Sequence, residues 1–147
     1  MALTHTDEHG QASMVDISAK PSSRREAIAT GHIKLQPATL ELIRQNQIQK
    51  GDVLAVSRIA GIMAAKQTRH LIPLCHQIPL SMVGVDFVLN DGGVTATATA
   101  KTTASTGVEM EALTAVSIAL LTIYDMCKAV DKSMRLDGIH LVSKSKA

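Results

Sequence analysis

Apolar positions along the chain fall into short runs that are typical of strands, separated by polar turns. One run lies at 25–35, where Ala27 and Ala29 alternate with Ile28 and Thr30. Two more, at 80–89 and 94–100, flank the sequence Asn90-Asp91-Gly92-Gly93, which is a strong turn signal and predicts a hairpin. A last short strand is expected at 139–142.

Three other segments have the spacing of helices. A short helix is expected at 37–47, because proline suits a first helical turn. Asp52 can cap a longer helix that ends before Pro73, and the small residues around Gly61 give that helix a face suited to close packing. The segment 107–130 has no internal glycine or proline, so it should form the longest element.

Strands and helices are interspersed, with a hairpin in the middle. This order predicts an α+β fold in which an antiparallel sheet carries helices packed on one face. The 147 residues suffice for one domain but not for two independent cores. Residues 1–22 are polar and broken by Gly10 and Pro21, so they are expected to form a mobile N-terminal arm before a single domain at 23–147.

Composition narrows the possible functions. Hydrophobic residues make up 46% of the chain, but Phe87 and Tyr124 are the only aromatics, so the core must be aliphatic. A net charge of +2, without aromatic side chains to stack on bases, does not favour nucleic-acid binding. No run approaches the ~20 apolar residues of a membrane span and no signal-peptide pattern is present, which predicts a cytoplasmic protein. Cys75 and Cys127 lack CxxC spacing, so neither a disulfide nor a metal site is expected.

His76 is the first candidate for chemistry. It follows Pro73 in a loop between two apolar elements, where an imidazole can act in binding or catalysis. A histidine that is only hydrogen-bonded at a helix end fits the same position, so a functional role requires partners. Glu109 and Glu111 open the next helix, where the helix dipole stabilises carboxylates. At i and i+2 they lie on different faces, which argues against one carboxylate pair.

Asp125 and Lys128 lie at i and i+3 on the same helix, within an apolar run. Neither ion is therefore expected to be freely solvated, and a perturbed titration would suit acid–base chemistry. The alternative is an ordinary helical salt bridge, with Lys128, Asp131 and Lys132 on a solvated face.

Lys50 and Lys66 bracket the second predicted helix. Lys50 lies at its amino end, where phosphate oxygens could meet backbone amides and a cation together. The chain has no Gly-x-x-x-x-Gly-Lys-Ser/Thr loop, so this is not a Walker-type nucleotide site. A solvated capping segment is the simpler interpretation of these residues.

These segments contain longer strings of residues, namely Leu3-Thr4-His5, Met14-Val15-Asp16, Lys50-Gly51-Asp52-Val53, Ala60-Gly61-Ile62, Leu71-Ile72-Pro73-Leu74-Cys75-His76, Gly107-Val108-Glu109-Met110-Glu111-Ala112-Leu113 and Tyr124-Asp125-Met126-Cys127-Lys128-Ala129. In this order and spacing they resemble the cyclic pyranopterin monophosphate synthase accessory-protein family (MoaC family). The resemblance covers nearly the whole chain, from Leu3 to about Ser145.

The resemblance implies a ferredoxin-like α+β subunit in a homohexamer, a trimer of dimers. It assigns both Glu111 and Asp125 to substrate handling, although they would lie roughly 21 Å apart along one predicted helix, so we expect sites shared between subunits. It also implies a lyase of molybdenum cofactor biosynthesis that converts (8S)-3′,8-cyclo-7,8-dihydroguanosine 5′-triphosphate to cyclic pyranopterin phosphate and diphosphate. Asp125 would be the catalytic acid/base, with Lys128 beside it. The substrate-binding residues would be Leu74, Cys75, His76, Met110, Glu111, Lys50, Lys66 and Arg25. No cofactor is expected, although a divalent ion could accompany the triphosphate.

Two other functions are compatible with the same fold. One is a catalytically silent subunit that binds a pterin or a nucleotide, which the intact Asp125 and Lys128 argue against. The other is a basic RNA-binding module, which the aromatic-poor composition disfavours. Gln77 follows His76 where proline is commoner in the family, and Ser105 stands where many relatives have lysine.

Overall fold

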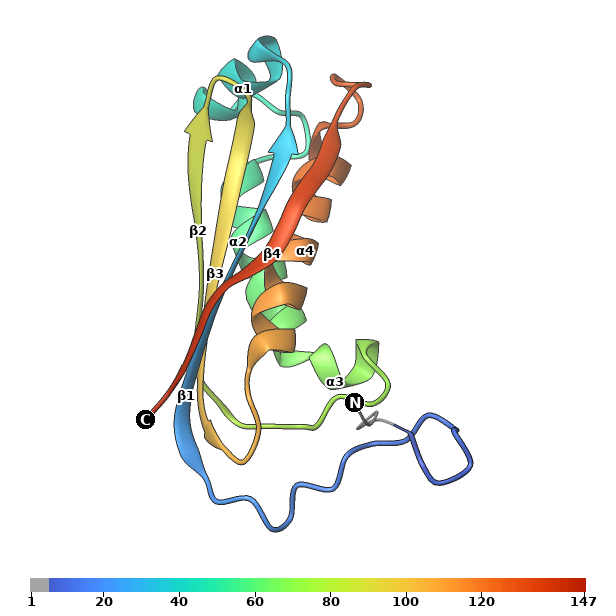
Figure 1. Cartoon of the computed structure of the whole chain (residues 1–147). Helices are drawn as coiled ribbons and strands as arrows, with labels where there is room; N and C mark the ends of the chain where they lie inside the picture. The colour runs from blue at the N-terminus through green and yellow to red at the C-terminus, as the bar shows by residue number, and fades with distance from the viewer. Residues whose placement is uncertain (1–5) are drawn as a thin grey trace.

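The computed structural model describes residues 6–147, so the string Leu3-Thr4-His5 lies outside the described residues. The elements follow one another as β1 Ser23–Lys34, α1 Pro37–Arg44, α2 Val53–Lys66, α3 Thr68–Leu71, β2 Leu80–Asn90, β3 Gly93–Ala104, α4 Glu109–Cys127 and β4 Arg135–Lys146. The strands form one sheet in the order β2-β3-β1-β4, and every neighbouring pair is antiparallel. Helices α2 and α4 lie side by side on one face of the sheet (Figure 1). This is the predicted ferredoxin-like α+β arrangement, and the predicted hairpin is β2–β3.

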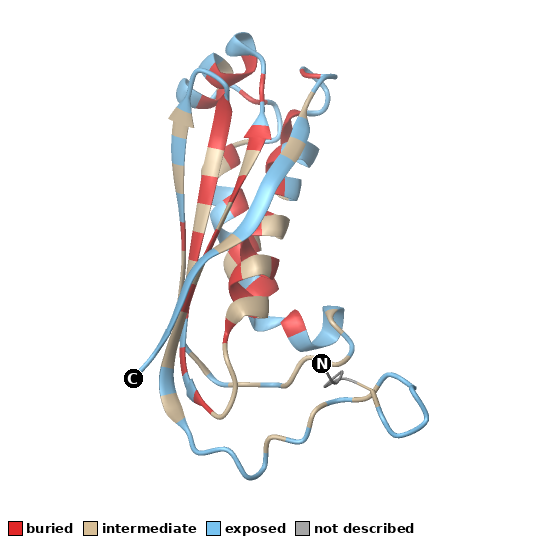
Figure 2. Cartoon of the chain, viewed as in Figure 1, coloured by how far each residue is buried: buried red, intermediate tan, exposed pale blue. Residues whose placement is uncertain are grey.

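The core lies between the central strands and the two long helices (Figure 2). Along β1, Ala27, Ala29 and Ile33 are fully buried, and the alternating residues Ile28, Thr30 and His32 face the other side of the sheet. The facing side chains of β3 are also mostly alanine, so Leu120 and Ile123 of α4 can approach the sheet closely. Both aromatic residues lie outside this core: Phe87 is half-buried and Tyr124 is 38% exposed. The prediction of an aliphatic core is therefore confirmed.

Several predicted boundaries are wrong. The strand expected at 139–142 is the much longer β4, which pairs along β1 as far as Arg25 with Lys146. The helix expected to run from Asp52 towards Pro73 ends at Lys66 and is followed by the short α3. At the break, the hydroxyl of Thr68 donates to the carbonyls of Ala64 (3.2 Å) and Ala65 (2.9 Å), so a side chain competes with the helical hydrogen bonds.

The expectation that no segment could span a bilayer is wrong for α4 if length and composition alone are considered. Of its apolar window, 56% is buried inside the molecule. A core helix that packs against both a sheet and another helix is apolar for that reason. This helix therefore gives little support for a membrane span.

Gly61 allows α2 to approach α4. A β-carbon at this position would lie 2.9 Å from the carbonyl oxygen of Ala115 and 3.2 Å from the β-carbon of Ala119. The small-residue face predicted around Gly61 is therefore used for packing within the subunit.

We expect Gly61→Ala to destabilise the protein. Alanine gains ~1 kcal/mol of helix propensity over glycine, but overpacking against a backbone atom costs about 1–3 kcal/mol, so the net change should be unfavourable. Gly84→Ala on β2 is the matched control, because its nearest neighbour would be the Met82 sulfur at 3.6 Å. Urea unfolding followed by far-ultraviolet circular dichroism measures both variants. Equal stability of the two variants would contradict this account of the α2–α4 contact.

Candidate functional site

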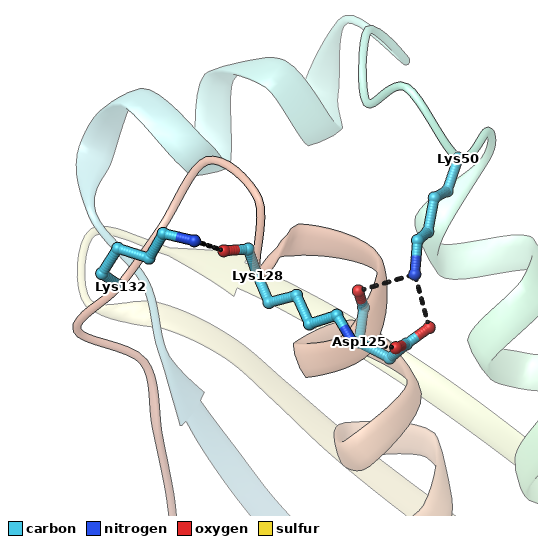
Figure 3. A network of polar contacts seen from close by, with 4 residues as sticks. All are labelled: Lys50, Asp125, Lys128 and Lys132. Atoms are coloured by element: carbon cyan, nitrogen blue, oxygen red, sulfur yellow. Dashed lines mark hydrogen bonds and ion pairs between the residues drawn. The ribbon is translucent and has the colours of Figure 1, made fainter.

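The first cluster of candidate residues lies at the carboxyl end of α4 (Figure 3). Asp125 Oδ2 accepts a hydrogen bond from Lys50 Nζ at 2.9 Å, and Asp125 Oδ1 lies 3.0 Å from Lys128 Nζ. Lys50 also donates to the Asp125 carbonyl at 3.2 Å. It reaches α4 from the loop between α1 and α2, so the pair that the sequence predicted is part of a three-residue cluster.

The charge on Asp125 is stabilised by hydrogen bonds from two lysines, in a position that is only partly shielded from solvent. The side chains of Lys50 and Asp125 are 48% and 55% exposed, so the expectation that Asp125 and Lys128 are shielded is wrong for the isolated subunit. The hydrogen bonds from Lys50 and Lys128 lower the pKa of Asp125 from its ordinary value. Asp125 is therefore a carboxylate at neutral pH and can accept a proton.

The alternative interpretation of Asp125 and Lys128 as a plain salt bridge is right about their i, i+3 spacing. It is wrong about Asp131, which is 2% exposed and does not lie on a solvated face. Sequence reasoning missed a role for Asp131, because the groups that surround it come from the start of α1.

The second cluster lies at the amino end of α4 and in the loop that precedes β2. Glu111 is only 4% exposed, and its Oε1 has no hydrogen-bond partner among the described residues. The Cys75 thiol points to the other carboxylate oxygen at 4.0 Å. Burial, and then repulsion from Glu109, raise the pKa of Glu111 from its ordinary value, although its own backbone amide acts in the opposite direction. Burial also raises the pKa of Cys75.

Two small pockets join the other predicted substrate residues to Glu111. One, of about 60 Å³, is lined in part by Lys66, His76, Gln77 and Glu111. Its neighbour, of about 170 Å³, is lined by Leu74, Cys75, His76, Thr106, Gly107, Glu109 and Met110. The structure thus brings Leu74, Cys75, His76, Met110, Glu111 and Lys66 together at one end of α4.

Residues 6–22 contain no named strand or helix, but they contact this second cluster. The ring nitrogen Nε2 of His76 is hydrogen-bonded to the Val15 carbonyl. Ser105 donates its hydroxyl proton to the Lys20 carbonyl at 3.0 Å. The string that contains Val15 gave no sign of this contact in the sequence, because a backbone carbonyl has no signature in a side-chain pattern.

Arg25 lies on β1 beside the same end of α4. Its Nε donates to the Ala104 carbonyl at 3.2 Å. A pocket of about 260 Å³ next to it is lined in part by Glu109, Lys144 and Lys146. Arg25 is therefore grouped with the Glu111 cluster and not with Asp125. Among residues 6–147, no three His, Cys, Asp or Glu side chains come together in a way that could hold a metal ion.

The sequence profile of the MoaC family matches residues 14–147. The chain belongs to the MoaC family. Among its relatives in that family, proteins of Chloroflexus aggregans and Limosilactobacillus fermentum are 58% and 57% identical, and both are named cyclic pyranopterin monophosphate synthase. Each alignment covers 97% of this MoaC-family chain and 87% of the relative. A molybdenum cofactor biosynthesis bifunctional protein of Chlorobaculum tepidum is 54% identical, and this chain aligns with 46% of its length.

Proposed function

We propose that this chain is a cyclic pyranopterin monophosphate synthase, a lyase of molybdenum cofactor biosynthesis. It converts (8S)-3′,8-cyclo-7,8-dihydroguanosine 5′-triphosphate to cyclic pyranopterin phosphate and releases diphosphate. The observation that carries the proposal is the ionised Asp125 held between Lys50 and Lys128, in a chain that is 58% identical to a synthase of that name. In this arrangement the carboxylate would receive the proton, and the adjacent ammonium groups would stabilise negative charge that develops on the substrate.

The two clusters have complementary proton chemistry. Asp125 is ionised and can take a proton from the substrate, while Lys128 beside it can supply one. Burial raises the pKa of Glu111 from its ordinary value, so we assign Glu111 as the group that gives a proton to the substrate. Carboxyl groups whose pKa values are displaced in opposite directions are a recurrent basis for acid and base assignments.

The cations at the Glu111 end are suited to a triphosphate. Lys66 and Arg25 both line pockets at this end of α4. Lysine acts on phosphate oxygens as a point charge, and arginine can bind two of them at once. Lys50, in contrast, donates its hydrogen bonds to Asp125, so we assign it to the reacting carboxylate. A divalent ion that accompanies the triphosphate is compatible with this proposal, and the protein needs no cofactor of its own.

The separation of the two clusters supports a homo-oligomer with shared sites. Glu111 and Asp125 lie near opposite ends of α4. At ~1.5 Å per residue they are roughly 21 Å apart along the helix axis, too far to meet on one small ring. We propose that each site takes the Glu111 end from one subunit and the Asp125 end from its partner, in a hexamer built from dimers. The protein would act in the cytoplasm, without nucleic acid or a membrane.

The direct test is incubation of the purified protein with the cyclised dihydro-GTP while diphosphate is measured. We expect diphosphate to appear in equal amount to cyclic pyranopterin phosphate, and GTP itself to give none. Binding of the substrate without release of diphosphate would instead support the catalytically silent binding subunit. Affinity for RNA that falls steeply with salt, without turnover, would support the RNA-binding module.

A further inference from the structure

Asp131 lies in the loop after α4, three residues beyond Lys128, and it is almost fully buried. Its Oδ2 accepts hydrogen bonds from the backbone amide of Gln36 and from the hydroxyl of Thr39, both at 2.9 Å. Its Oδ1 accepts from the amide and the hydroxyl of Ser133, at 3.1 and 3.2 Å. Each oxygen therefore holds a different segment: one holds α1 and the other holds the loop after α4.

The carboxylate form of Asp131 depends on these donors. Burial alone raises the pKa of Asp131, but the hydrogen bonds from Gln36, Ser133 and Thr39 outweigh burial and lower it from its ordinary value. Within residues 6–147, no cation forms an ion pair with Asp131. A buried charge without a counterion is stable only if its hydrogen bonds are all made, so the segments that supply them must stay in place.

Asp131 also supplies what α1 lacks. The residue before this helix, Gln36, makes no capping hydrogen bond with its side chain, and the first turn contains no acidic residue. A negative charge at the amino end of a helix interacts favourably with the helix dipole. Because Asp131 lies beyond α4, its contact with the start of α1 joins two segments that are far apart in the sequence.

The chain that leaves α1 leads to Lys50. Before Lys50 the chain passes the buried Ile48, and directly after Lys50 it turns at Gly51, where φ is 114°. The ion pair that Lys50 makes with Asp125 is about half exposed, and exposed pairs between long side chains do little to fix a backbone. The position of Lys50 relative to α4 must therefore be fixed by buried contacts. Asp131 provides one such contact, which links the start of α1 directly to the loop after α4.

We propose that Asp131 is a positioning residue: by clamping the start of α1 to the loop after α4, it keeps the ammonium group of Lys50 on Asp125, beside Lys128. Its effect on turnover rests on the proposed function. Its effect on the geometry of Lys50 does not.

The test uses Thr39, because its hydroxyl can be removed without a change of shape. We expect Thr39→Val to lower kcat/KM for diphosphate release by about tenfold or more, since small displacements of catalytic groups have effects of this size. Thr39→Ser keeps the hydroxyl and should restore most of the rate. Thr30→Val is the matched control: it removes a threonine hydrogen bond to the Ala96 carbonyl, at 2.9 Å, on the face of the sheet that carries no helix.

The decisive measurement is a double-mutant cycle with Lys50→Ala. If Asp131 acts through Lys50, Thr39→Val should have little further effect on kcat/KM once Lys50 is gone. A loss of equal size in both backgrounds, or no loss in either, would overturn the proposal. Asp131→Asn provides a second variant: asparagine has one acceptor oxygen, so either α1 or Ser133 loses its partner however the side chain is oriented.

A second arm does not depend on turnover. With carbon-13-labelled aspartate, nuclear magnetic resonance follows the titration of Asp125, whose pKa is lowered first by the hydrogen bond from Lys50. We expect this pKa to rise in Thr39→Val and in Asp131→Asn, and to be unchanged in Thr30→Val. An unchanged Asp125 pKa in the first two variants overturns the positioning role. If the wild-type protein releases no diphosphate, the proposed function fails, and the titration still decides the role of Asp131.

Discussion

Asp125→Asn should reduce diphosphate release by about 10²- to 10⁴-fold, the usual contribution of a general acid or base. Asparagine keeps the shape of the side chain but cannot accept a proton. The protein should remain folded, because Asp125 is half exposed and its carboxylate contacts only Lys50 and Lys128 among the described residues. Lys128→Ala should be similarly inactive. Steady-state kinetics and thermal unfolding measure the two effects separately.

Asp137 provides a matched control for this experiment. It is also a partly exposed aspartate, and it is paired with Arg135 at 3.4 Å on β4. We expect Asp137→Asn to keep near-wild-type kcat and KM, because this ion pair does not belong to either cluster. A near-wild-type rate in Asp125→Asn would show that the acid/base assignment is wrong, whatever the result for Asp137.

A mixture of two inactive proteins should regain activity if the sites are shared. Glu111→Gln should be inactive, because glutamine cannot give up a proton. After subunit exchange between Glu111→Gln and Asp125→Asn, some dimers contain one subunit of each kind. In such a dimer one site has both intact ends and the other has neither. With random pairing of equal amounts, about half of the dimers are mixed and half of their sites are intact, so roughly a quarter of the wild-type rate is expected.

A different mixture serves as the control for subunit exchange. Asp125 and Lys128 lie at the same end of α4, so a mixture of Asp125→Asn with Lys128→Ala leaves every site damaged. No activity should return in that mixture. Exchange itself is verified by mass spectrometry of differently tagged subunits. If exchange is complete and the first mixture also stays inactive, the shared-site geometry is refuted, and the family assignment is unaffected.

The elements that were predicted well have a local signal. The β2–β3 hairpin is marked by its turn sequence, and α4 by a long apolar pattern without a breaker. Strand β4 was underestimated because it lies at the sheet edge, where most side chains meet solvent and show no apolar alternation. Its hydrogen bonds to β1 come from the backbone, which pairs in the same way for polar and apolar residues.

In the candidate site, too, features with a local sequence pattern could be predicted and tertiary contacts could not. The spacing of Asp125 and Lys128 on one helix is visible in the sequence, and so is the divergence of Glu109 and Glu111. The contact of Lys50 with Asp125 depends on how the loop between α1 and α2 meets the end of α4, and no local pattern encodes it. The alternative that places Asp131 on a solvated face is wrong for the same reason, because its burial depends on contacts with the start of α1.

An optical probe is already present at the proposed site. The chain has no tryptophan, and Tyr124, its only tyrosine, is partly exposed on α4 next to Asp125. The emission of tyrosine therefore comes from a single position on α4, beside the reacting carboxylate in the sequence. Substrate binding at the Asp125 end can therefore be followed by fluorescence without any label.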